Sequence, residues 1–218
     1  MFTDPACGVA RAHYGDEATV EPALPGPFRI EACDANSPRR AEAEHYVRER
    51  FRRTHGAVIR TFMPELLLLT RADGALAGVA GCRPAGQGPL FLERYLDGPI
   101  ELLITRYARM RVKRSQVVEA GNFACRDSHT ARAFMALLPR YLIERQHVWI
   151  AFTATVSIRR ILRSLGASCL ELGSARDACV RDGDDWWGSY YDNDPRVMLG
   201  YLPLARRIPA FSGQWHAD

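Results

Sequence analysis

The sequence predicts an α+β domain with a mixed sheet, and three stretches carry this prediction. Residues 116–124 (QVVEAGNFA) are β-prone and lead through a polar turn into residues 131–146, whose apolar residues recur with helical period. Residues 148–152 (VWIAF) are short and uniformly apolar, as in a buried strand, and another helical pattern follows them. Residues 65–80 contain two apolar runs joined by Ala-Asp-Gly, a strong hairpin signal. An early hairpin followed by a strand–helix–strand unit is typical of a mixed sheet.

The remaining elements follow in order. Ser37-Pro38 is a helix start with proline at the tolerated first position, and Gly56 ends that helix. Ser157 is the expected N-cap of the helix after the apolar strand, and Gly166 is placed to end it. Further strands are expected at residues 28–32, 169–172 and 196–202, and residues 101–114 are expected to form a helix or a loop of basic character.

Length and composition indicate one globular domain. The chain has 218 residues, of which 47% are hydrophobic and 25% charged, close to globular averages. Residues 1–27 are rich in Pro and Gly and show no periodicity, so they are expected to form a flexible arm. We therefore expect one domain over residues 28–204 and a tail over residues 205–218.

The cysteines and the hydropathy pattern bear on the compartment. The six cysteines lie far apart with no Cys-x-x-Cys pair, which favours reduced thiols in a cytoplasmic protein over a disulfide framework or a zinc site. No apolar run approaches the roughly 18 residues needed to span a bilayer. The sequence thus predicts a cytoplasmic location, no metal and no stable membrane insertion.

Two features of the stretch around residue 119 point to chemistry. A strand that leads directly into a helix start is a common anion site, because the first helical turn offers unpaired N–H groups. Glu119 lies among Val117, Val118 and Phe123, where a carboxylate is costly to bury without a partner. It is either salt-bridged to one of the arginines at 106–114 or a general base whose pKa burial raises.

Several segments resemble a known family. The segments VEAGNFA (118–124), FTAT (152–155), RSLG (163–166) and WGSYY (187–191) look like those of the thermostable hemolysin family, over about residues 28–203. The order of elements is similar to that of the GNAT acyltransferases, to which that family's pattern is related. Glu119 to Ala124 is also similar to the Glu-x-Ser-Arg-Phe-Ala segment of acyl-homoserine-lactone synthases.

The resemblance implies a fold and a donor. In GNAT-like proteins the central strand pair splays apart to admit a pantetheine arm, so acyl-CoA or the phosphopantetheine of an acyl carrier protein is the expected acyl donor. Asn122 would hydrogen-bond pantetheine or hold a bulge, and a backbone N–H near Phe123 to Cys125 would polarise the thioester carbonyl. The residues implied for cofactor binding are Asn122, Phe123, Ala124, Cys125, Arg126, Ser128, His129, Thr130, Ala131, Thr153 and Thr155.

The turn after residue 125 departs from the GNAT pattern. That pattern is Arg/Gln-x-x-Gly-x-Gly/Ala, and residues 126–131 match its two ends, but His129 replaces the middle glycine. A side chain there would crowd a coenzyme A diphosphate, whereas it would suit the single phosphate of a carrier-protein pantetheine. An ordinary capped turn is the alternative.

The aromatic run at residues 186–191 (WWGSYY) is the third candidate segment. Trp186 and Trp187 are expected to pack on the sheet. In the functional interpretation the segment is an acceptor lid, in which Tyr190 or Tyr191 protonates the departing thiolate. The aspartates that flank it, which would attract a cationic amine, are Asp182, Asp184, Asp185, Asp192 and Asp194.

The segment Arg106 to Arg114 carries five cations and no acid. It is either a solvated face or a docking surface for an acidic acyl carrier protein. Nucleic acid is disfavoured, because aromatic residues do not interleave with the charges. Cys125 is either a buried inert thiol or, less consistently with direct GNAT-type attack, an acyl-transfer nucleophile.

Together these features predict an enzyme that moves an acyl group from a pantetheine thioester to an amine of a small molecule in a biosynthetic pathway. Glu119 would deprotonate the amine. Two other functions stay open at this point: a membrane-active, hemolysin-like protein, and a non-catalytic module that binds pantetheine.

Overall fold

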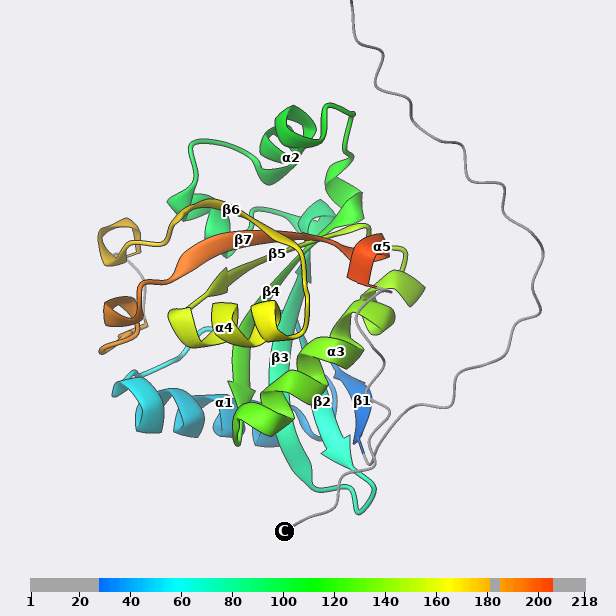
Figure 1. Cartoon of the computed structure of the whole chain (residues 1–218). Coiled ribbons are helices and arrows are strands. Elements are labelled where there is room, and N and C mark those ends of the chain that lie inside the picture. Colours follow the sequence, from blue (N-terminus) through cyan, green and yellow to red (C-terminus); the bar gives the residue numbers. More distant parts are fainter. Residues whose placement is uncertain (1–27, 181–184, 206–218) are drawn as a thin grey trace, which may run out of the picture.

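The computed structural model describes residues 28–180 and 185–205. A seven-stranded mixed sheet with the order β1-β2-β3-β4-β5-β7-β6 lies at its centre (Figure 1). Every neighbouring pair is antiparallel except β4 and β5, which run parallel. The predicted fold class is confirmed. The strands are β1 (Phe28–Cys33), β2 (Glu65–Arg71), β3 (Leu76–Pro84), β4 (Val117–Cys125), β5 (Trp149–Ala154), β6 (Cys169–Ser174) and β7 (Arg196–Tyr201).

Helices cover both faces of this sheet. The α-helices are α1 (Arg40–His55), α2 (Ile100–Ala108), α3 (Ser128–Glu144), α4 (Val156–Ser164) and α5 (Leu202–Ala205). The 3-10 helices are η1 (Ala85–Gln87), η2 (Phe91–Tyr95), η3 (Arg114–Gln116), η4 (Asp177–Cys179) and η5 (Tyr191–Asn193).

Strand β2 shows which helix covers which face. Its four leucines, 66 to 69, are all completely buried. Leu67 and Leu69 belong to a cluster with Phe134 of α3, whereas Leu66 and Leu68 belong to a cluster with α1. Because successive strand residues point to opposite faces, α1 and α3 lie on opposite sides of the sheet. Helix α4 lies beside α3 (Figure 1).

The C-terminal ends of the helices were predicted more accurately than their first residues. Gly56 directly follows α1 and Gly166 follows the C-cap residue of α4; both have positive φ, 64° and 70°, so the two glycine stop signals are confirmed. Helix α1 begins at Arg40, a little after Ser37-Pro38. Helix α4 begins at Val156, with Thr155 at the N-cap position, so the prediction of Ser157 as N-cap is wrong. Thr155 has the extended backbone that an N-cap requires, and Ser157 is already helical.

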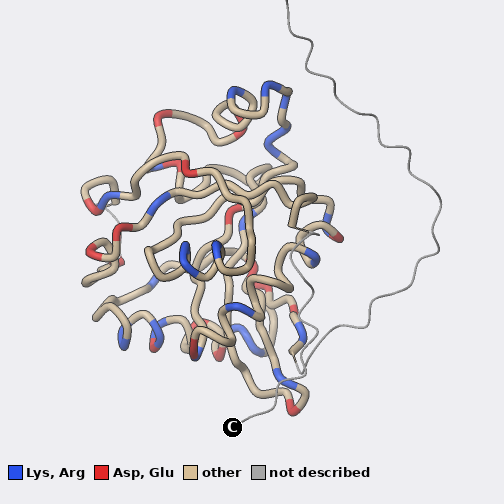
Figure 2. The backbone as a smooth tube through the Cα atoms, viewed as in Figure 1, with Lys and Arg blue, Asp and Glu red and all other residues tan. Residues whose placement is uncertain are grey.

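Charged residues are spread over the outside of the molecule (Figure 2). Along α1, cations and acids alternate and form ion pairs one turn apart, such as Arg40–Glu44 at 2.8 Å. Within the described ranges no helix is both long and apolar enough to cross a bilayer. The predicted arm over residues 1–27 and the tail from residue 206 lie outside the described residues.

Candidate functional site

The two central strands diverge halfway along their length. Strands β4 and β5 pair only from Val117 opposite Trp149 to Ala120 opposite Phe152. Beyond that point β4 continues to Cys125 alongside β3, and β5 continues to Ala154 alongside β7. The sheet therefore opens into a V, as expected for the splayed strand pair.

A bulge in β4 lies at the start of this opening. Gly81 of β3 pairs with Gly121 and Val79 pairs with Ala124, so two residues of β4, Asn122 and Phe123, face one residue of β3. Asn122 has φ 46°. Its side-chain oxygen accepts a hydrogen bond from the Met63 N–H at 2.9 Å, which ties the bulge to the segment before β2. Of the two roles considered for Asn122, these contacts favour holding the bulge.

A cavity of about 650 Å³ occupies the opening. It is lined from α1 on one side of the sheet and from α3 and α4 on the other. Since these helices cover opposite faces, the cavity passes through the gap between β4 and β5. It has two arms, which differ in chemistry.

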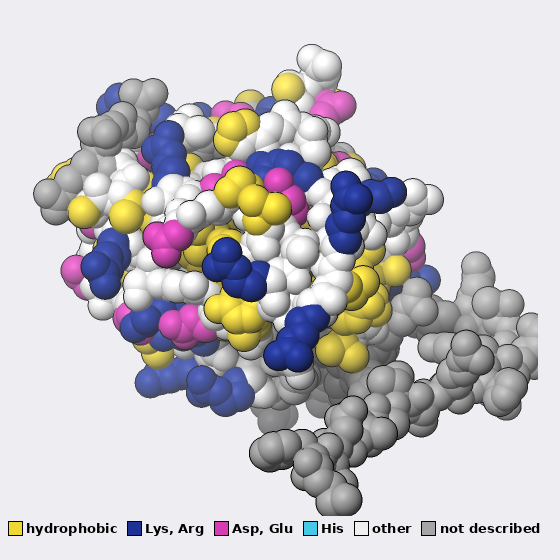
Figure 3. All heavy atoms as spheres, turned by 90° about the horizontal axis from the view of Figure 1, so that it is seen from above, with side chains coloured by type: hydrophobic (Ala, Val, Ile, Leu, Met, Phe, Trp, Pro, Cys, Tyr) yellow, Lys and Arg dark blue, Asp and Glu magenta, His cyan; other side chains and the backbone are white. Residues whose placement is uncertain are grey.

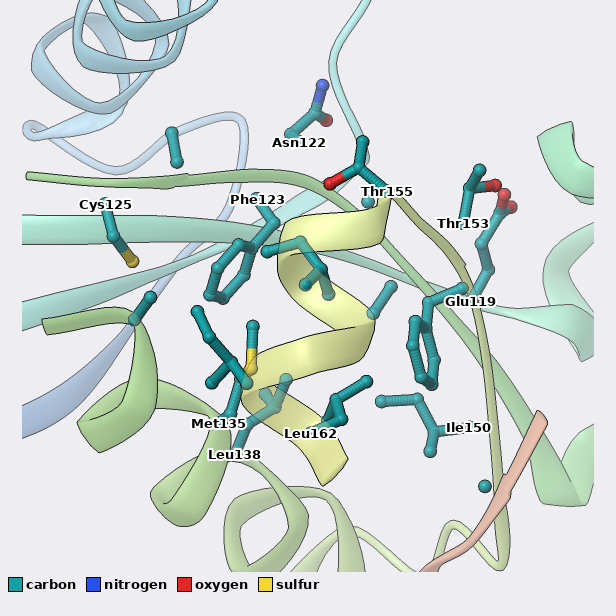
Figure 4. A pocket seen from close by; sticks show the side chains of 18 of the residues that line it. Glu119, Asn122, Phe123, Cys125, Met135, Leu138, Ile150, Thr153, Thr155 and Leu162 are labelled. Carbon is teal, nitrogen blue, oxygen red and sulfur yellow. The ribbon is translucent and has the colours of Figure 1, made fainter. Parts of the chain in front are cut away.

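The first arm, here called the α3–α4 arm, is apolar. Figure 4 shows Phe123, Met135, Leu138, Ile150 and Leu162 converging on one space between the two helices and the sheet. Helix α4 buries none of its residues fully, although its apolar residues recur at helical spacing. Three residues of this stripe line the arm: Ile158, Ile161 and Leu162. The space has the character of a site for a hydrocarbon chain.

The second arm, here called the aromatic arm, lies on the α1 side. Trp187 is central to it, with ring centroids 5.9 Å from Phe91 and 5.4 Å from Tyr190. The Tyr190 ring also meets His55 edge-on at 5.3 Å. Burial lowers the pKa of His55, so its imidazole is neutral near pH 7. Aromatic faces of this kind bind apolar groups and organic cations.

Glu119 lies in the aromatic arm and is only 3% exposed. Its two oxygens accept hydrogen bonds from the N–H groups of Phe91 and Leu92 at 2.8 and 2.9 Å. Burial raises the pKa of Glu119 to about 7, against the opposite effect of these two hydrogen bonds. Each oxygen retains a second lone pair, so the group can still accept a proton.

The expected salt bridge between Glu119 and the 106–114 segment is not formed. Arg114 instead pairs with Glu93 at 2.6 Å and with Glu101 at 2.7 Å. The sequence offered no means of choosing among these three acids, because all of them lie within about 20 residues of Arg114. Glu119 therefore forms no ion pair with that segment, and its role as a general base stays a prediction.

The two candidate tyrosines differ in position. Tyr190 lines the cavity, and its hydroxyl makes no hydrogen bond with any described residue. Tyr191 lies outside the lining, and its hydroxyl is 2.7 Å from that of Tyr95. Burial raises the pKa of both phenols, that of Tyr191 to about 12, so both keep their protons at neutral pH. Of these two tyrosines, Tyr190 is the one whose hydroxyl is available to a molecule in the cavity.

Two of the three described acidic residues of the predicted lid, Asp185 and Asp194, are engaged by other groups. Asp185 accepts hydrogen bonds from the N–H groups of Arg60 and Thr61. Asp194 forms ion pairs with Arg159 and Arg196, each at 2.8 Å. Asp182 and Asp184 lie outside the described residues. Trp187 packs against a cluster with residues of β2, β3 and β4, as expected, but Trp186 is 68% exposed, so its predicted packing on the sheet is wrong.

The predicted phosphate turn begins helix α3. Asp127 is its N-cap, with the carboxylate 2.8 Å from the Thr130 N–H, and this contact lowers the pKa of Asp127 to about 2. Nearby, Arg50 of α1 donates to the carbonyl of Arg126 at 3.0 Å, and its Nε is buried without a partner. An anion at this turn would meet the Arg50 guanidinium and one carboxylate. The turn is thus capped, as in the alternative prediction, and also faces the cavity.

Eight of the eleven residues predicted to bind the cofactor line the cavity. These are Asn122, Phe123, Ala124, Cys125, Ser128, Ala131, Thr153 and Thr155. Arg126, His129 and Thr130 do not line it, and the crowding of a diphosphate by His129 stays a prediction. Burial raises the pKa of the Cys125 thiol, which agrees with the inert role.

Sequence reasoning missed the wall of the aromatic arm contributed by α1 and η2. Phe51 and His55 come from the end of α1, and Phe91 and Tyr95 come from a segment expected to be irregular. They lie far from β4 in the sequence, and no local pattern connects them to it. The two backbone hydrogen bonds to Glu119 are what hold η2 beside the strand.

The chain matches a known protein family in sequence and several solved structures in fold. The sequence model of the family described as thermostable hemolysin matches residues 33–205, which is most of the chain. The chain belongs to the thermostable hemolysin family. A search of the curated proteins found no match.

Solved structures with the same fold include two acyl-homoserine-lactone synthases and an N-acyl amino acid synthase. The acyl-homoserine-lactone synthase LasI is 12% identical, with a TM-score of 0.58, over 88% of this chain and 99% of that one. FeeM, an N-acyl amino acid synthase from uncultured soil microbes, is 16% identical, with a TM-score of 0.56, over 85% and 97%. MesI, a CoA-dependent acyl-homoserine lactone synthase, is 19% identical, with a TM-score of 0.53, over 87% and 97%. At these identities the likeness establishes the shared fold.

Proposed function

We propose that this protein is an N-acyltransferase that moves a fatty acyl group from a pantetheine thioester to the amine of a small molecule. The observation that carries the proposal is the cavity through the split between β4 and β5, with an apolar arm on one side and Glu119 on the other. The structural neighbours named above perform acyl transfer or synthesis of acylated products, which supports this reaction class.

The chemistry follows from the two arms. The thioester would lie at the bulge, with its acyl chain in the α3–α4 arm and its carbonyl toward a backbone N–H of residues 123–125. The amine would occupy the aromatic arm and attack the carbonyl carbon. As the C–N bond forms and the C–S bond breaks, Glu119 takes a proton from the amine and Tyr190 gives one to the thiolate.

The donor is either acyl-CoA or an acyl carrier protein. In either case the phosphate nearest to pantetheine would bind at the turn of Ser128 to Ala131, beside Arg50. The basic segment Arg106–Arg114 leads into the Val117 end of β4, whereas this turn follows the Cys125 end. A carrier protein docked on the basic segment would face the wrong end of the strand, so we place its docking at the mouth beside α3. The cytoplasmic location predicted from the thiols is part of this proposal, and the five cysteines that the structure describes are free.

The test is a direct assay of the purified protein. Acetyl-CoA, a long-chain acyl-CoA and a long-chain acyl carrier protein are each offered with a mixture of primary amines and amino acids. Thiol release and N-acyl products are followed by a thiol reagent and by mass spectrometry. We expect a long-chain donor to be used and Glu119→Gln to be nearly inactive.

Two results would refute the proposal. Pantetheine binding without turnover by any donor would indicate a non-catalytic binding module. Leakage of liposomes by the purified protein in the absence of any donor binding would favour the lytic function.

A further inference from the structure

Helix α2 and the turn after it carry a surface that the proposed reaction does not use. Residues 100–113 project from one end of the molecule, at the top of Figure 1. Three of the eight large hydrophobic side chains that are exposed among the described residues lie in this short stretch. They are Leu102 at 59%, Tyr107 at 55% and Met110 at 58% exposure.

Four cations share this surface. Arg106, Arg109, Arg111 and Lys113 are exposed, and none of them forms an ion pair with any described residue. The neighbouring acids do not neutralise them, because Glu93 and Glu101 are both paired with Arg114. Figure 2 shows these cations at the end of the molecule where α2 lies.

The apolar side chains are held outward by the structure around them. Ile100 and Ile104 are fully buried and fix one side of α2 in the core. The turn is closed by the Val112 N–H, which donates to the Thr105 hydroxyl at 3.0 Å. Leu102 and Arg106 lie one turn apart on the opposite side of α2, and Met110 follows in the turn after the helix. Figure 3 looks down on this end, where hydrophobic and Lys or Arg side chains lie next to each other.

We infer that α2 and residues 109–113 form a docking surface for an anionic lipid membrane. The cations would contact the anionic headgroups of a bilayer. The exposed apolar side chains beside them would contact the edge of its acyl region. An acidic protein would match the charges, but the cations stand at the far end of β4 from the phosphate turn. Eight residue steps of about 3.3 Å separate the two ends, roughly 26 Å. A pantetheine carrier bound at α2 would therefore not present its phosphate to the turn.

The inference is tested by vesicle flotation of the full chain. Vesicles of phosphatidylcholine with phosphatidylglycerol are compared with vesicles of phosphatidylcholine alone. We expect binding only to the anionic vesicles, and its weakening by added salt. Arg106→Gln/Arg111→Gln should reduce the partition coefficient roughly 30-fold, since each cation near an anionic surface contributes about fivefold. Leu102→Ser/Met110→Ser should reduce it about tenfold or more.

A matched control removes the same charge elsewhere. Arg29 on β1 and Arg60 after α1 are exposed and form no ion pair with described residues, so Arg29→Gln/Arg60→Gln should bind vesicles like the wild type. Circular dichroism and acyl transfer from a soluble donor should be unchanged in all variants, which separates this inference from the proposed function. Equal vesicle binding by the α2 variants and the control, or no binding to anionic vesicles, would overturn it. Capture of an acyl carrier protein in place of vesicles, lost in the α2 variant, would assign the surface to an acidic protein and overturn it equally.

Discussion

Glu119 is the residue on which the proposed chemistry depends most. It is held in place by the same two N–H groups that hold η2 against β4, so its position and that of Phe91 are coupled. Burial brings its pKa to about 7, where a general base is both available and strong enough.

We predict that Glu119→Gln lowers kcat for acyl transfer by about 100-fold or more, because it removes the proton acceptor but keeps the shape. In the wild type, kcat/KM should rise with pH through an apparent pKa near 7 as the carboxylate forms. That rise should be absent in the variant. Initial rates measured across roughly pH 5 to 9 give both results. An unchanged pH profile in the variant would assign the base to another group.

Tyr190 and Tyr191 provide a matched pair for the general acid. Tyr190→Phe removes a hydroxyl that faces the cavity, and we expect kcat to fall by about 10- to 100-fold with a donor whose thiolate leaves poorly. Tyr191→Phe removes a hydroxyl bonded to Tyr95, and we expect nearly wild-type kcat with a loss of about 1 kcal/mol of stability. Kinetics and urea denaturation of the two variants separate the roles, and the reverse pattern would make Tyr191 the acid.

Helix α4 shows most clearly that the same apolar stripe can pack in a core or line a cavity, depending on the elements around it. Its stripe has the spacing of a core helix, yet α4 buries no residue fully, because the stripe faces the space left by the divergence of β4 and β5. The length and width of the α3–α4 arm should therefore set the acyl chain length.

We predict that Leu162→Trp shortens the acyl chains that the enzyme accepts. The larger ring would fill part of the α3–α4 arm, and each methylene that loses its place costs about 0.8 kcal/mol, or roughly fourfold in kcat/KM. Long-chain donors should lose more than tenfold, while acetyl donors should change little. Arg160→Trp places the same ring on the exposed side of α4 and serves as the control. Equal losses for long and short donors in Leu162→Trp would show a folding effect instead.

At the scale of the whole molecule, Glu119 also affects stability. An ordinary carboxyl has its pKa near 4.5, and in the folded protein that of Glu119 is raised to about 7. The folded state therefore binds more protons than the unfolded state between these values. This contribution to stability is fully present below about pH 4.5 and is lost as the pH rises through about 7.

We predict that the difference in unfolding free energy between the wild type and Glu119→Gln changes by on the order of 3 kcal/mol across this window. The wild type should become less stable relative to the variant as the pH rises. Urea denaturation of both proteins at several pH values gives this difference in unfolding free energy. The effects of the other titrating groups are the same in both proteins and cancel in the difference. A difference independent of pH would mean that the pKa of Glu119 is not raised in the folded protein.

The proposed reaction and the proposed membrane contact lie at opposite ends of β4. The cavity opens beyond Ala120, toward the Cys125 end, and α2 stands near the Val117 end. One rigid sheet holds both sites, so neither needs a conformational change to coexist with the other.

Local patterns in the sequence determined the order of the elements. The hairpin, the helix ends at Gly56 and Gly166, and the strand–turn–helix unit around Glu119 all depend on interactions between residues near in sequence, and they were predicted correctly. The N-cap of α4 was misplaced, because Thr155 and Ser157 are both good caps and only the length of β5 decides between them.

The tertiary structure decided the site. Whether Glu119 pairs with an arginine, which tyrosine has a free hydroxyl, and whether the stripe of α4 packs in the core or lines a cavity all depend on contacts across the sheet. Phe51, Phe91 and Tyr190 come from three distant segments, and only the divergence of β4 and β5 leaves a space for them to surround. A sequence pattern shows which side chains are apolar. The same apolar residues are suited to a buried core and to the wall of an apolar cavity, so the pattern alone does not distinguish the two.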